Sequence, residues 1–374
     1  MKKIFYIILI ICLCGLFQFQ TESSIQKLLI GSYTSSSKSD GIYVYAFNSK
    51  TGDAELISKV SGEENPSYLT VSRDRKYVYA VNEVREGKIS SFLLNSTTGE
   101  LTFLNRVSSG GVSPCYVSVD DNNKYVFVGN YGNGTLSAIP LKADGSLGDN
   151  IQTIQEEGRS INERRQTGPH VHCTVLSPDN KFLLTSNLGT DRLSIYRFEA
   201  GKYSDPLTPG EPPYISVKAG SGPRHLTFHP SSKFVYLITE LTGMIIAFDY
   251  KNGKLIEKQE ITMLSPDFEG SVGGADIHIS PDGNFLYGSN RGDANELVIF
   301  SINKSGELNY VGRQSTFGKG PRNFVIDPTG NFLLVANQNS NEVIIFNRNR
   351  KTGLLTPSGK SIHLNSPVCL KFLN

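Results

Sequence analysis

One pattern of apolar and polar positions returns along nearly the whole chain. A segment of alternating apolar and polar residues leads into a four-residue turn, such as Ser280-Pro281-Asp282-Gly283, and a second segment rich in β-branched and aromatic residues follows. Two such segments joined by a tight turn predict a β-hairpin. Complete copies of the pattern begin at Asn65, Ser113, Gly168, Gly222, Gly274 and Gly320, and a truncated copy, SPVCLKFLN, ends the chain.

The intervals between the copies contain further strand-like segments. Examples are residues 244–249 and 297–302, each followed by a Lys-Asn-Gly or Lys-Ser-Gly sequence that suits a turn. Each repeat thus has about four strands over roughly 40 to 55 residues, which is typical of a β-propeller blade. The segment KLLIGSY at residues 27–33 matches the second half of the repeat and can complete the truncated copy. We predict an all-β, seven-bladed β-propeller of four-stranded antiparallel blades, closed by the N- and C-terminal strands, as one domain over residues 25–374.

The repeat also predicts which residues share one end of the central channel. The first strand of each blade runs along the channel and the second returns antiparallel, so the start of the first and the end of the second lie on one face. The start register contains Ser67, Cys115, His172, Arg224, Ala275, Arg322 and Val368. The end register contains Glu83, Tyr131, Leu188, Glu240, Arg291 and Gln338, with Tyr33 as the counterpart in the closing blade.

Charged residues in these registers indicate a functional site. Three arginines, two glutamates and one histidine converge at a partly desolvated position, where isolated charges are costly unless they are paired or used. The excess of arginine predicts a positive site that suits an anionic ligand, such as a carboxylate or a phosphate. A ring of ion pairs that joins the blades, for example between Arg224 and Glu240, is the structural alternative.

The histidines suggest no metal site. His170 and His172 alternate along one predicted strand and can face the same side, but no third ligand of suitable type is evident nearby. We therefore predict no metal, and we assign one of the two to catalysis or substrate binding. Three further histidines fall in strands or turns and are interpreted as structural: His225, His229 and His278.

Signatures of other chemistries are absent from the sequence. It has no GxSxG, HExxH or Walker motif, and we predict no cofactor. Cys115, Cys173 and Cys369 are widely spaced and odd in number, which indicates neither a disulfide framework nor a zinc site. The net charge of +2 comes from interspersed residues without a basic block, so we expect no nucleic-acid partner.

The first residues differ from the repeats. Lys2 and Lys3 precede an apolar run over residues 4–17, and a polar stretch follows up to residue 24. This arrangement is typical of a secretory signal, and the run is shorter than the ~20 apolar residues that span a bilayer. We expect residues 1–24 to be a targeting segment and the mature protein to be exported, periplasmic or extracytoplasmic, without a stable membrane span. A cytoplasmic location is the alternative if this segment is not a signal.

The residues of the two registers resemble the lactonase family of seven-bladed propellers, which includes bacterial 6-phosphogluconolactonase and the fungal carboxymuconate cyclase. The most specific segments are GPHVH at Gly168, GPRHLTFHP at Gly222, ISPDGNFLYGSNRG at Ile279 and GPRNFVIDPTGNFLLVANQ at Gly320. The resemblance implies that the catalytic residues are His172, Arg224, Glu240 and Arg291, and that Arg322 and Gln338 extend the substrate pocket. The registers and the neighbouring histidine add four substrate-binding candidates: Glu83, Tyr131, Tyr33 and His170.

The reaction implied by this resemblance is hydrolysis of a small, anionic sugar δ-lactone, such as 6-phospho-glucono-1,5-lactone, which yields 6-phosphogluconate in the pentose phosphate pathway of glucose metabolism. Glu240 would activate water as the general base, and the arginines would stabilise the tetrahedral oxyanion. His172 would protonate the ring oxygen or position the substrate. An export signal conflicts with a phosphorylated substrate made in the cytoplasm, so an unphosphorylated lactone is also open.

Other functions remain compatible with the sequence. A non-catalytic propeller that binds a ligand or a protein could use the same end of the channel, because the fold alone does not determine function. A muconate-type lactone cycloisomerase could use the same residues. The calcium-dependent six-bladed lactonases are disfavoured by the seventh repeat and by the arginine-rich rather than carboxylate-rich site.

Overall fold

The computed structural model describes residues 24–35, 37–149, 152–202 and 204–373. The predicted targeting segment lies outside these ranges, except for its last residue. Within the described ranges, no helix is both long and apolar enough to cross a membrane.

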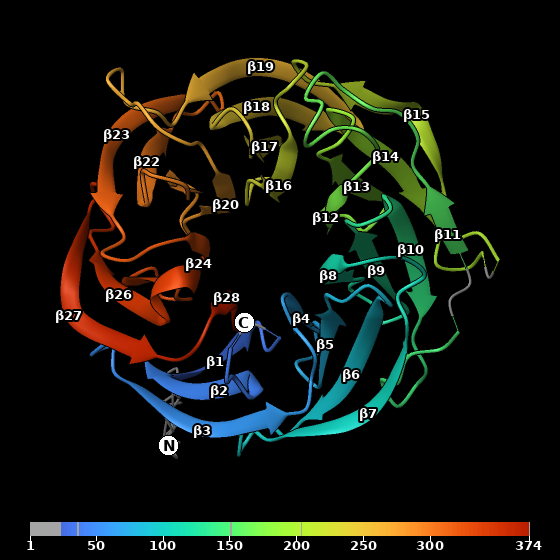
Figure 1. Cartoon of the computed structure of the whole chain (residues 1–374), viewed down its shortest axis with the longest axis horizontal. Coiled ribbons are helices and arrows are strands. Elements are labelled where there is room, and N and C mark those ends of the chain that lie inside the picture. Colours follow the sequence, from blue (N-terminus) through green and yellow to red (C-terminus); the bar gives the residue numbers. More distant parts are fainter. Residues whose placement is uncertain (1–23, 36, 150–151, 203, 374) are drawn as a thin grey trace, which may run out of the picture.

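Seven four-stranded antiparallel sheets form a ring around a central axis (Figure 1). Each sheet is one blade, and its strands follow one another from the axis outwards. The first blade consists of β28 (Pro367–Phe372), β1 (Ile25–Ser32), β2 (Gly41–Asn48) and β3 (Ala54–Ser61). The second consists of β4 (Leu69–Val71), β5 (Tyr77–Asn82), β6 (Lys88–Leu94) and β7 (Leu101–Ser108). The third consists of β8 (Pro114–Val119), β9 (Tyr125–Asn130), β10 (Thr135–Pro140) and β11 (Gln152–Gln155).

The remaining four blades continue in chain order around the ring. The fourth consists of β12 (Val171–Leu176), β13 (Phe182–Asn187), β14 (Arg192–Phe198) and β15 (Leu207–Ser216). The fifth consists of β16 (Pro223–Phe228), β17 (Phe234–Thr239), β18 (Met244–Lys251) and β19 (Lys254–Thr262). The sixth consists of β20 (Gly274–Ile279), β21 (Phe285–Asn290), β22 (Glu296–Ile302) and β23 (Leu308–Ser315). The seventh consists of β24 (Pro321–Ile326), β25 (Phe332–Asn337), β26 (Glu342–Arg348) and β27 (Leu355–His363), with the short 3-10 helix η1 (Gln338–Ser340) after β25.

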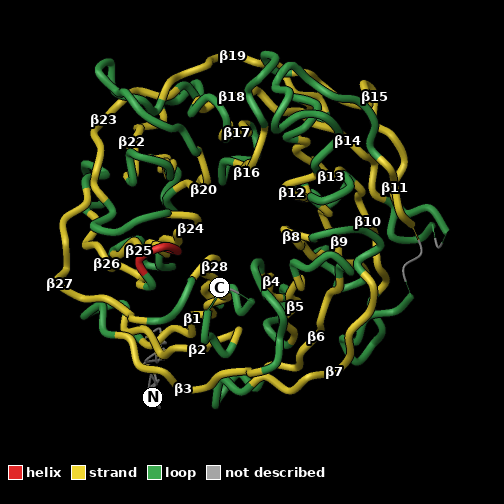
Figure 2. Tube along the Cα trace, viewed as in Figure 1, coloured by secondary structure: helices red, strands yellow, loops and turns green. Residues whose placement is uncertain are grey.

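The two ends of the chain share the first blade. β28 pairs antiparallel with β1, so that Leu28 lies opposite Phe372 and Ile30 lies opposite Leu370. The predicted closure of the ring by the terminal strands is therefore confirmed, as is the seven-bladed fold (Figure 2). The pairing covers a sheet edge that an open ring would expose.

The core of the molecule lies between neighbouring blades. The strands β9, β13, β21 and β25 are buried at every residue, because both faces of each sheet are covered by the next blades. Such strands read as nearly continuous apolar runs. The outermost strands, such as β3 and β27, have many exposed side chains instead. Aromatic rings fill the space between blades, as where Phe127 of β9 meets Phe198 of β14 edge-on at 5.0 Å.

Short polar turns fix the register of the hairpins. In the sixth blade, Ser280 Oγ donates to Asp282 Oδ1 at 2.6 Å, and Gly283 has the left-handed φ of 74° that glycine adopts without strain. The fourth blade has the equivalent contact, from Ser177 Oγ to Asp179 Oδ1 at 2.6 Å. Because each turn has a fixed length, each hairpin carries the start of its first strand and the end of its second strand to the same end of the ring.

Candidate active site

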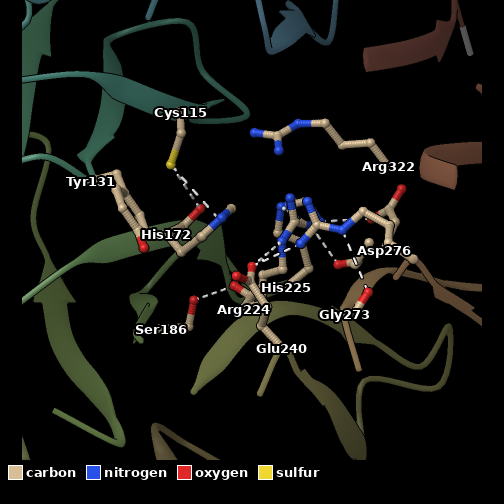
Figure 3. A network of polar contacts seen from close by, with 12 residues as sticks. Cys115, Tyr131, His172, Ser186, Arg224, His225, Glu240, Gly273, Asp276 and Arg322 are labelled. Atoms are coloured by element: carbon tan, nitrogen blue, oxygen red, sulfur yellow. Dashed lines mark hydrogen bonds and ion pairs between the residues drawn. The ribbon is translucent and has the colours of Figure 1, made fainter. Parts of the chain in front are cut away.

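The two predicted registers meet at one end of the ring axis. Arg224 lies in β16 and is 1% exposed, and Glu240 directly follows β17 and is 7% exposed. The pairing register of β16 shifts between Pro223 and Leu226, which marks a β-bulge. As a result, the consecutive side chains of Arg224 and His225 contact each other at 3.3 Å instead of pointing to opposite faces. Figure 3 shows these residues within a network of polar contacts.

Three arginines surround the carboxylate of Glu240. Its Oε2 accepts hydrogen bonds from Arg224 Nε at 3.1 Å and from Arg291 Nη2 at 3.0 Å, and its Oε1 accepts one from Arg165 Nη2 at 2.6 Å. Burial raises the pKa of this carboxyl, but Arg291, Arg224 and Arg165 together outweigh burial and lower the pKa to about 2. Glu240 is therefore ionised at neutral pH, and in this arrangement it is a weak base.

The sequence prediction missed Arg165. This residue lies on the loop of residues 156–170 between β11 and β12, outside the repeat that defined the registers. Its guanidinium also donates to the hydroxyl of Tyr131 at 3.1 Å. The available signal was the length of the loop, because long loops in compact domains are often functional.

A buried polar network formed by the same blade and its two neighbours supports Arg224. Arg224 Nη1 donates to the carbonyl oxygen of Ala275 at 2.5 Å, and Ser186 Oγ donates to the carbonyl of Arg224. His225 hydrogen-bonds through Nδ1 to Asp276 Oδ1 at 2.7 Å. Burial and the neighbouring Arg224 lower the pKa of His225 to about 3, so its ring is neutral. A neutral ring that donates from Nδ1 has a free lone pair on Nε2, which accepts from Arg224 Nη1.

Asp276 is the centre of this network. It is 2% exposed and also interacts with His278 Nε2 at 2.9 Å, the backbone N–H of Phe324 at 3.2 Å and the side-chain amide of Asn323. Burial raises the pKa of this carboxyl, but His278 and His225 outweigh burial and hold the pKa well below its usual range. Asp276 was not singled out from the sequence, because it lies one position after the register residue Ala275.

His170 and His172 both face Tyr131. The ring of His170, directly before β12, stacks on Tyr131 at 4.4 Å and its Nδ1 lies 2.7 Å from the carbonyl oxygen of Tyr131. His172 meets the Tyr131 ring edge-on at 5.4 Å, and its Nδ1 lies 3.8 Å from Cys115 Sγ. Burial, followed by Arg224, lowers the pKa of His172 well below its usual value, so this ring is neutral. The described residues contain no group of three side chains suited to hold a metal ion.

Arg322 lies on the other side of the axis with Glu83 and Tyr33. Tyr33 donates to Glu83 Oε2 at 2.8 Å, and the Arg322 guanidinium lies 5.4 Å from the centre of the Tyr33 ring. The carboxylate of Glu83 is 3.8 Å from Arg322 Nη2, and the guanidinium makes no hydrogen bond within the described residues. Arg322 therefore has donors available at the centre of the site (Figure 3).

The site carries an excess of positive charge. Arg165, Arg224, Arg291 and Arg322 face two carboxylates, those of Glu83 and Glu240. Burial, and after it the positive charge of the nearby Arg224, lower the pKa of Arg291 to about 10. An anion placed among these guanidinium groups would relieve that repulsion.

Gln338 lies at the equivalent register position of the seventh blade, without a hydrogen bond to this cluster among the described residues. It begins η1, its backbone N–H donates to the carbonyl of Gly320 at 3.0 Å, and no hydrogen bond of its side chain to the cluster is found among the described residues. Gln338 instead lines a polar surface hollow together with Ser37, Asn339 and Asn365. The other register positions, Ser67, Leu188, Ala275 and Val368, are buried without charge.

Known proteins are similar to this chain in both sequence and fold. The family model described as a seven-bladed β-propeller lactonase matches residues 27–372. The 6-phosphogluconolactonase of Formosa agariphila is 38% identical over 350 residues, covering 92% of this chain and 98% of its own length. The 6-phosphogluconolactonase of Bacillus subtilis is 34% identical over 352 residues, covering 92% and 97%.

A solved structure extends the comparison to the arrangement of the blades. The periplasmic gluconolactonase of Pseudomonas aeruginosa superposes with a TM-score of 0.90 at 35% identity, covering 94% of this chain and 99% of its own. The sequence repeat, the seven blades of the structure and the family match over residues 27–372 all indicate the same family. The chain belongs to the lactonase family of seven-bladed β-propellers.

Proposed function

We propose that this protein is a carboxylic ester hydrolase that opens a sugar δ-lactone with water. The observation that carries the proposal is that Arg224 and Arg291 bind the carboxylate of Glu240, with Arg322 facing the same space (Figure 3). Guanidinium donors suit the oxyanion that forms when a carbonyl is attacked, and a carboxylate can accept a proton from the attacking water. The names of the relatives support the same chemistry.

In the proposed reaction, a water molecule attacks the lactone carbonyl carbon while Glu240 takes one of its protons. The carbonyl oxygen becomes an oxyanion that Arg291 and Arg322 stabilise. The tetrahedral intermediate then collapses, the bond from the carbonyl carbon to the ring oxygen breaks, and the protonated Glu240 returns its proton to the ring oxygen. The product is an open hydroxy acid, and one water has been consumed.

His172 has a positioning role in this proposal. Its low pKa keeps the ring neutral at pH 7, so it holds no acidic proton of the imidazolium type for the ring oxygen. Of the two roles considered for His172 from the sequence, the low pKa favours orientation of the substrate over proton donation. Its Nε2 makes no hydrogen bond among the described residues and is available to a sugar hydroxyl.

The substrate proposed is the δ-lactone of a gluconate-type sugar acid, with the 6-phosphate form as the first candidate. The excess of arginine supports a phosphorylated substrate, as do the two relatives named 6-phosphogluconolactonase, and a 6-phosphate would place the reaction in the pentose phosphate pathway. The relative named periplasmic gluconolactonase supports the unphosphorylated lactone and, with it, export. We propose that residues 1–24 direct export and that residues 25–374 act as one domain.

The direct test is hydrolysis by the purified protein. Glucono-δ-lactone and its 6-phosphate should each be followed by acid release in a pH-stat, against the spontaneous reaction in buffer. We expect at least one lactone to be hydrolysed well above the spontaneous rate. A rate equal to that of buffer on both lactones would overturn the proposed function.

A further inference from the structure

Arg165 is held over the site by a well-anchored loop. Asn162 Oδ1 accepts hydrogen bonds from the backbone N–H groups of Arg164 and Arg165, each at 3.1 Å. Gln166, which is fully buried, donates through Nε2 to the carbonyl oxygen of Leu188 at 2.9 Å. The backbone at Arg165 is thus fixed, whereas its side chain remains 42% exposed to solvent.

The two oxygens of Glu240 have different partners. Oε2 is shared by Arg224 and Arg291, whose side chains are 2% and 19% exposed, and Arg224 is tied further to Ala275 and His225. Among the described residues, Oε1 accepts a hydrogen bond from Arg165 alone. The Arg165 side chain already reaches solvent and can rotate outwards when another anion replaces the buried carboxylate, whereas the guanidinium groups of Arg224 and Arg291 are enclosed and cannot leave.

We propose that Arg165 is a specificity residue that exchanges Glu240 for an anionic group on the substrate, a phosphate or a carboxylate. Its guanidinium would then bind the substrate anion, and Oε1 of Glu240 would become free to accept a proton from water. This inference rests on the proposed lactone hydrolysis. It explains how a carboxylate occupied by three arginines can serve as a base when the substrate is present.

The charges around Glu240 give this exchange a direction. Arg224 from β16 and Arg291 after β21 stay in contact with Glu240. The hydroxyl of Tyr131 after β9 accepts from Arg165, and Arg322 from β24 pairs with Glu83 rather than with Glu240. Departure of Arg165 removes one of the three cations that hold down the pKa of the carboxyl, so Glu240 becomes a stronger base. A neutral lactone offers Arg165 no alternative partner and leaves it on Oε1.

The test uses the full-length protein with Arg165→Gln and, as a matched control, Arg164→Gln. Arg164 is the exposed neighbour on the same loop, and its side chain makes no hydrogen bond or ion pair within the described residues. The substrates are glucono-δ-lactone, its 6-phosphate and a glucarolactone with a carboxylate at C6. The two charged lactones distinguish which anion Arg165 recognises.

We expect Arg165→Gln to lower kcat/KM for a charged lactone relative to the neutral one by about 10- to 100-fold, mainly through KM, because a charge-assisted hydrogen bond is lost. For the neutral lactone, the acid limb of the pH profile of kcat/KM should shift to higher pH, since Glu240 loses a cation. Arg165→Lys should recover part of the discrimination. Arg164→Gln should behave as wild type.

Two results would overturn the inference. In the first, Arg165→Gln has the same ratio of kcat/KM between charged and neutral lactones, and the same acid limb of the pH profile, as Arg164→Gln. Arg165 would then recognise no anion, and hydrolysis by the wild-type protein would still leave the proposed function standing. Absence of hydrolysis by the wild-type protein would remove both the proposed function and the role of Arg165.

Discussion

At the scale of single residues, the environment of Arg224 is set by a neighbour that never touches the proposed substrate position. Asp276 Oδ1 accepts a hydrogen bond from His225 Nδ1 at 2.7 Å. The other ring nitrogen, Nε2, is therefore free to accept from Arg224 Nη1 at 3.3 Å. The hydrogen bond on one ring nitrogen thus determines what the other can do. Asp276 is a positioning residue in this account.

Asp276→Asn should weaken both folding and activity. The amide keeps one acceptor for two histidine donors and removes a buried charge, so the Arg224 guanidinium loses its fixed orientation. We expect kcat/KM for the lactone to fall by about 10- to 100-fold, the cost of a small misplacement at a reacting centre. Thermal melting should report destabilisation of about 3 kcal/mol for a broken buried network.

The matched control for this prediction is Asp282→Asn. Asp282 lies in a hairpin turn, where it accepts from Ser280 and pairs with Arg348 at 3.5 Å. This variant should keep wild-type kcat/KM. A folded Asp276→Asn protein with unchanged kcat/KM would show that Arg224 needs no support from His225.

At the scale of elements, the hairpins explain what the sequence could predict. Each turn has a fixed length, so a count along the repeat placed Arg224, Glu240 and Arg291 at one end of the ring. The same count placed Gln338 there, and its backbone N–H bonds to Gly320 as that of Glu240 bonds to Gly222, although its side chain makes no hydrogen bond to the cluster among the described residues.

Bulges and loops explain what the sequence could not predict. The shift in register between Pro223 and Leu226 lets His225 contact Arg224, which strict alternation forbids. A similar shift between Gly274 and Ile277 accompanies the inward position of Asp276. Arg165 belongs to the loop between β11 and β12, outside the repeated hairpin, so no periodic argument could place it.

Closure of the first blade by β28 should be essential to stability. Leu370 in β28 is fully buried, and it lies opposite Ile30 of β1. Leu370→Ala should lower the free energy of unfolding by about 2 to 5 kcal/mol, as expected for a large-to-small change in a core. Urea denaturation followed by circular dichroism measures this change.

Leu93→Ala is the control for the closing strand. Leu93 lies in β6 and is 42% exposed, so its loss should cost much less than that of Leu370. If the two variants unfolded at the same urea concentration, the terminal strand would contribute no more than a surface position.

At the scale of the whole molecule, the ring buries ionisable groups around its axis, and stability should depend on pH. His225 has a pKa of about 3 in the folded protein, and Glu240 has a pKa of about 2. Both values are lower than in an unfolded chain, where they are about 6.5 and 4.3. The unfolded chain therefore binds more protons in acid, and the free energy of unfolding must fall as the pH is lowered.

The expected loss begins below about pH 6.5, where His225 and His172 are protonated only in the unfolded chain. It steepens below about pH 4.3, where Glu240 adds to it, with up to about 1.4 kcal/mol per pH unit for each group. Urea denaturation at a series of pH values tests this. A constant free energy of unfolding between about pH 7 and pH 5 would contradict the buried, neutral state of the histidines.

The central claim is that Glu240, among its arginines, carries out lactone hydrolysis. The most direct measurement compares initial rates of hydrolysis of glucono-δ-lactone and its 6-phosphate by the wild-type protein, Glu240→Gln and Glu296→Gln. Glu296 pairs with Arg313 at 2.8 Å between β22 and β23, which makes it a matched glutamate outside the site. Melting curves would verify that each variant is folded at the assay temperature.

Loss of a general base predicts a fall of about 100- to 10,000-fold for Glu240→Gln, and near wild-type rates for Glu296→Gln. A folded Glu240→Gln protein that hydrolyses either lactone at the wild-type rate would contradict the account.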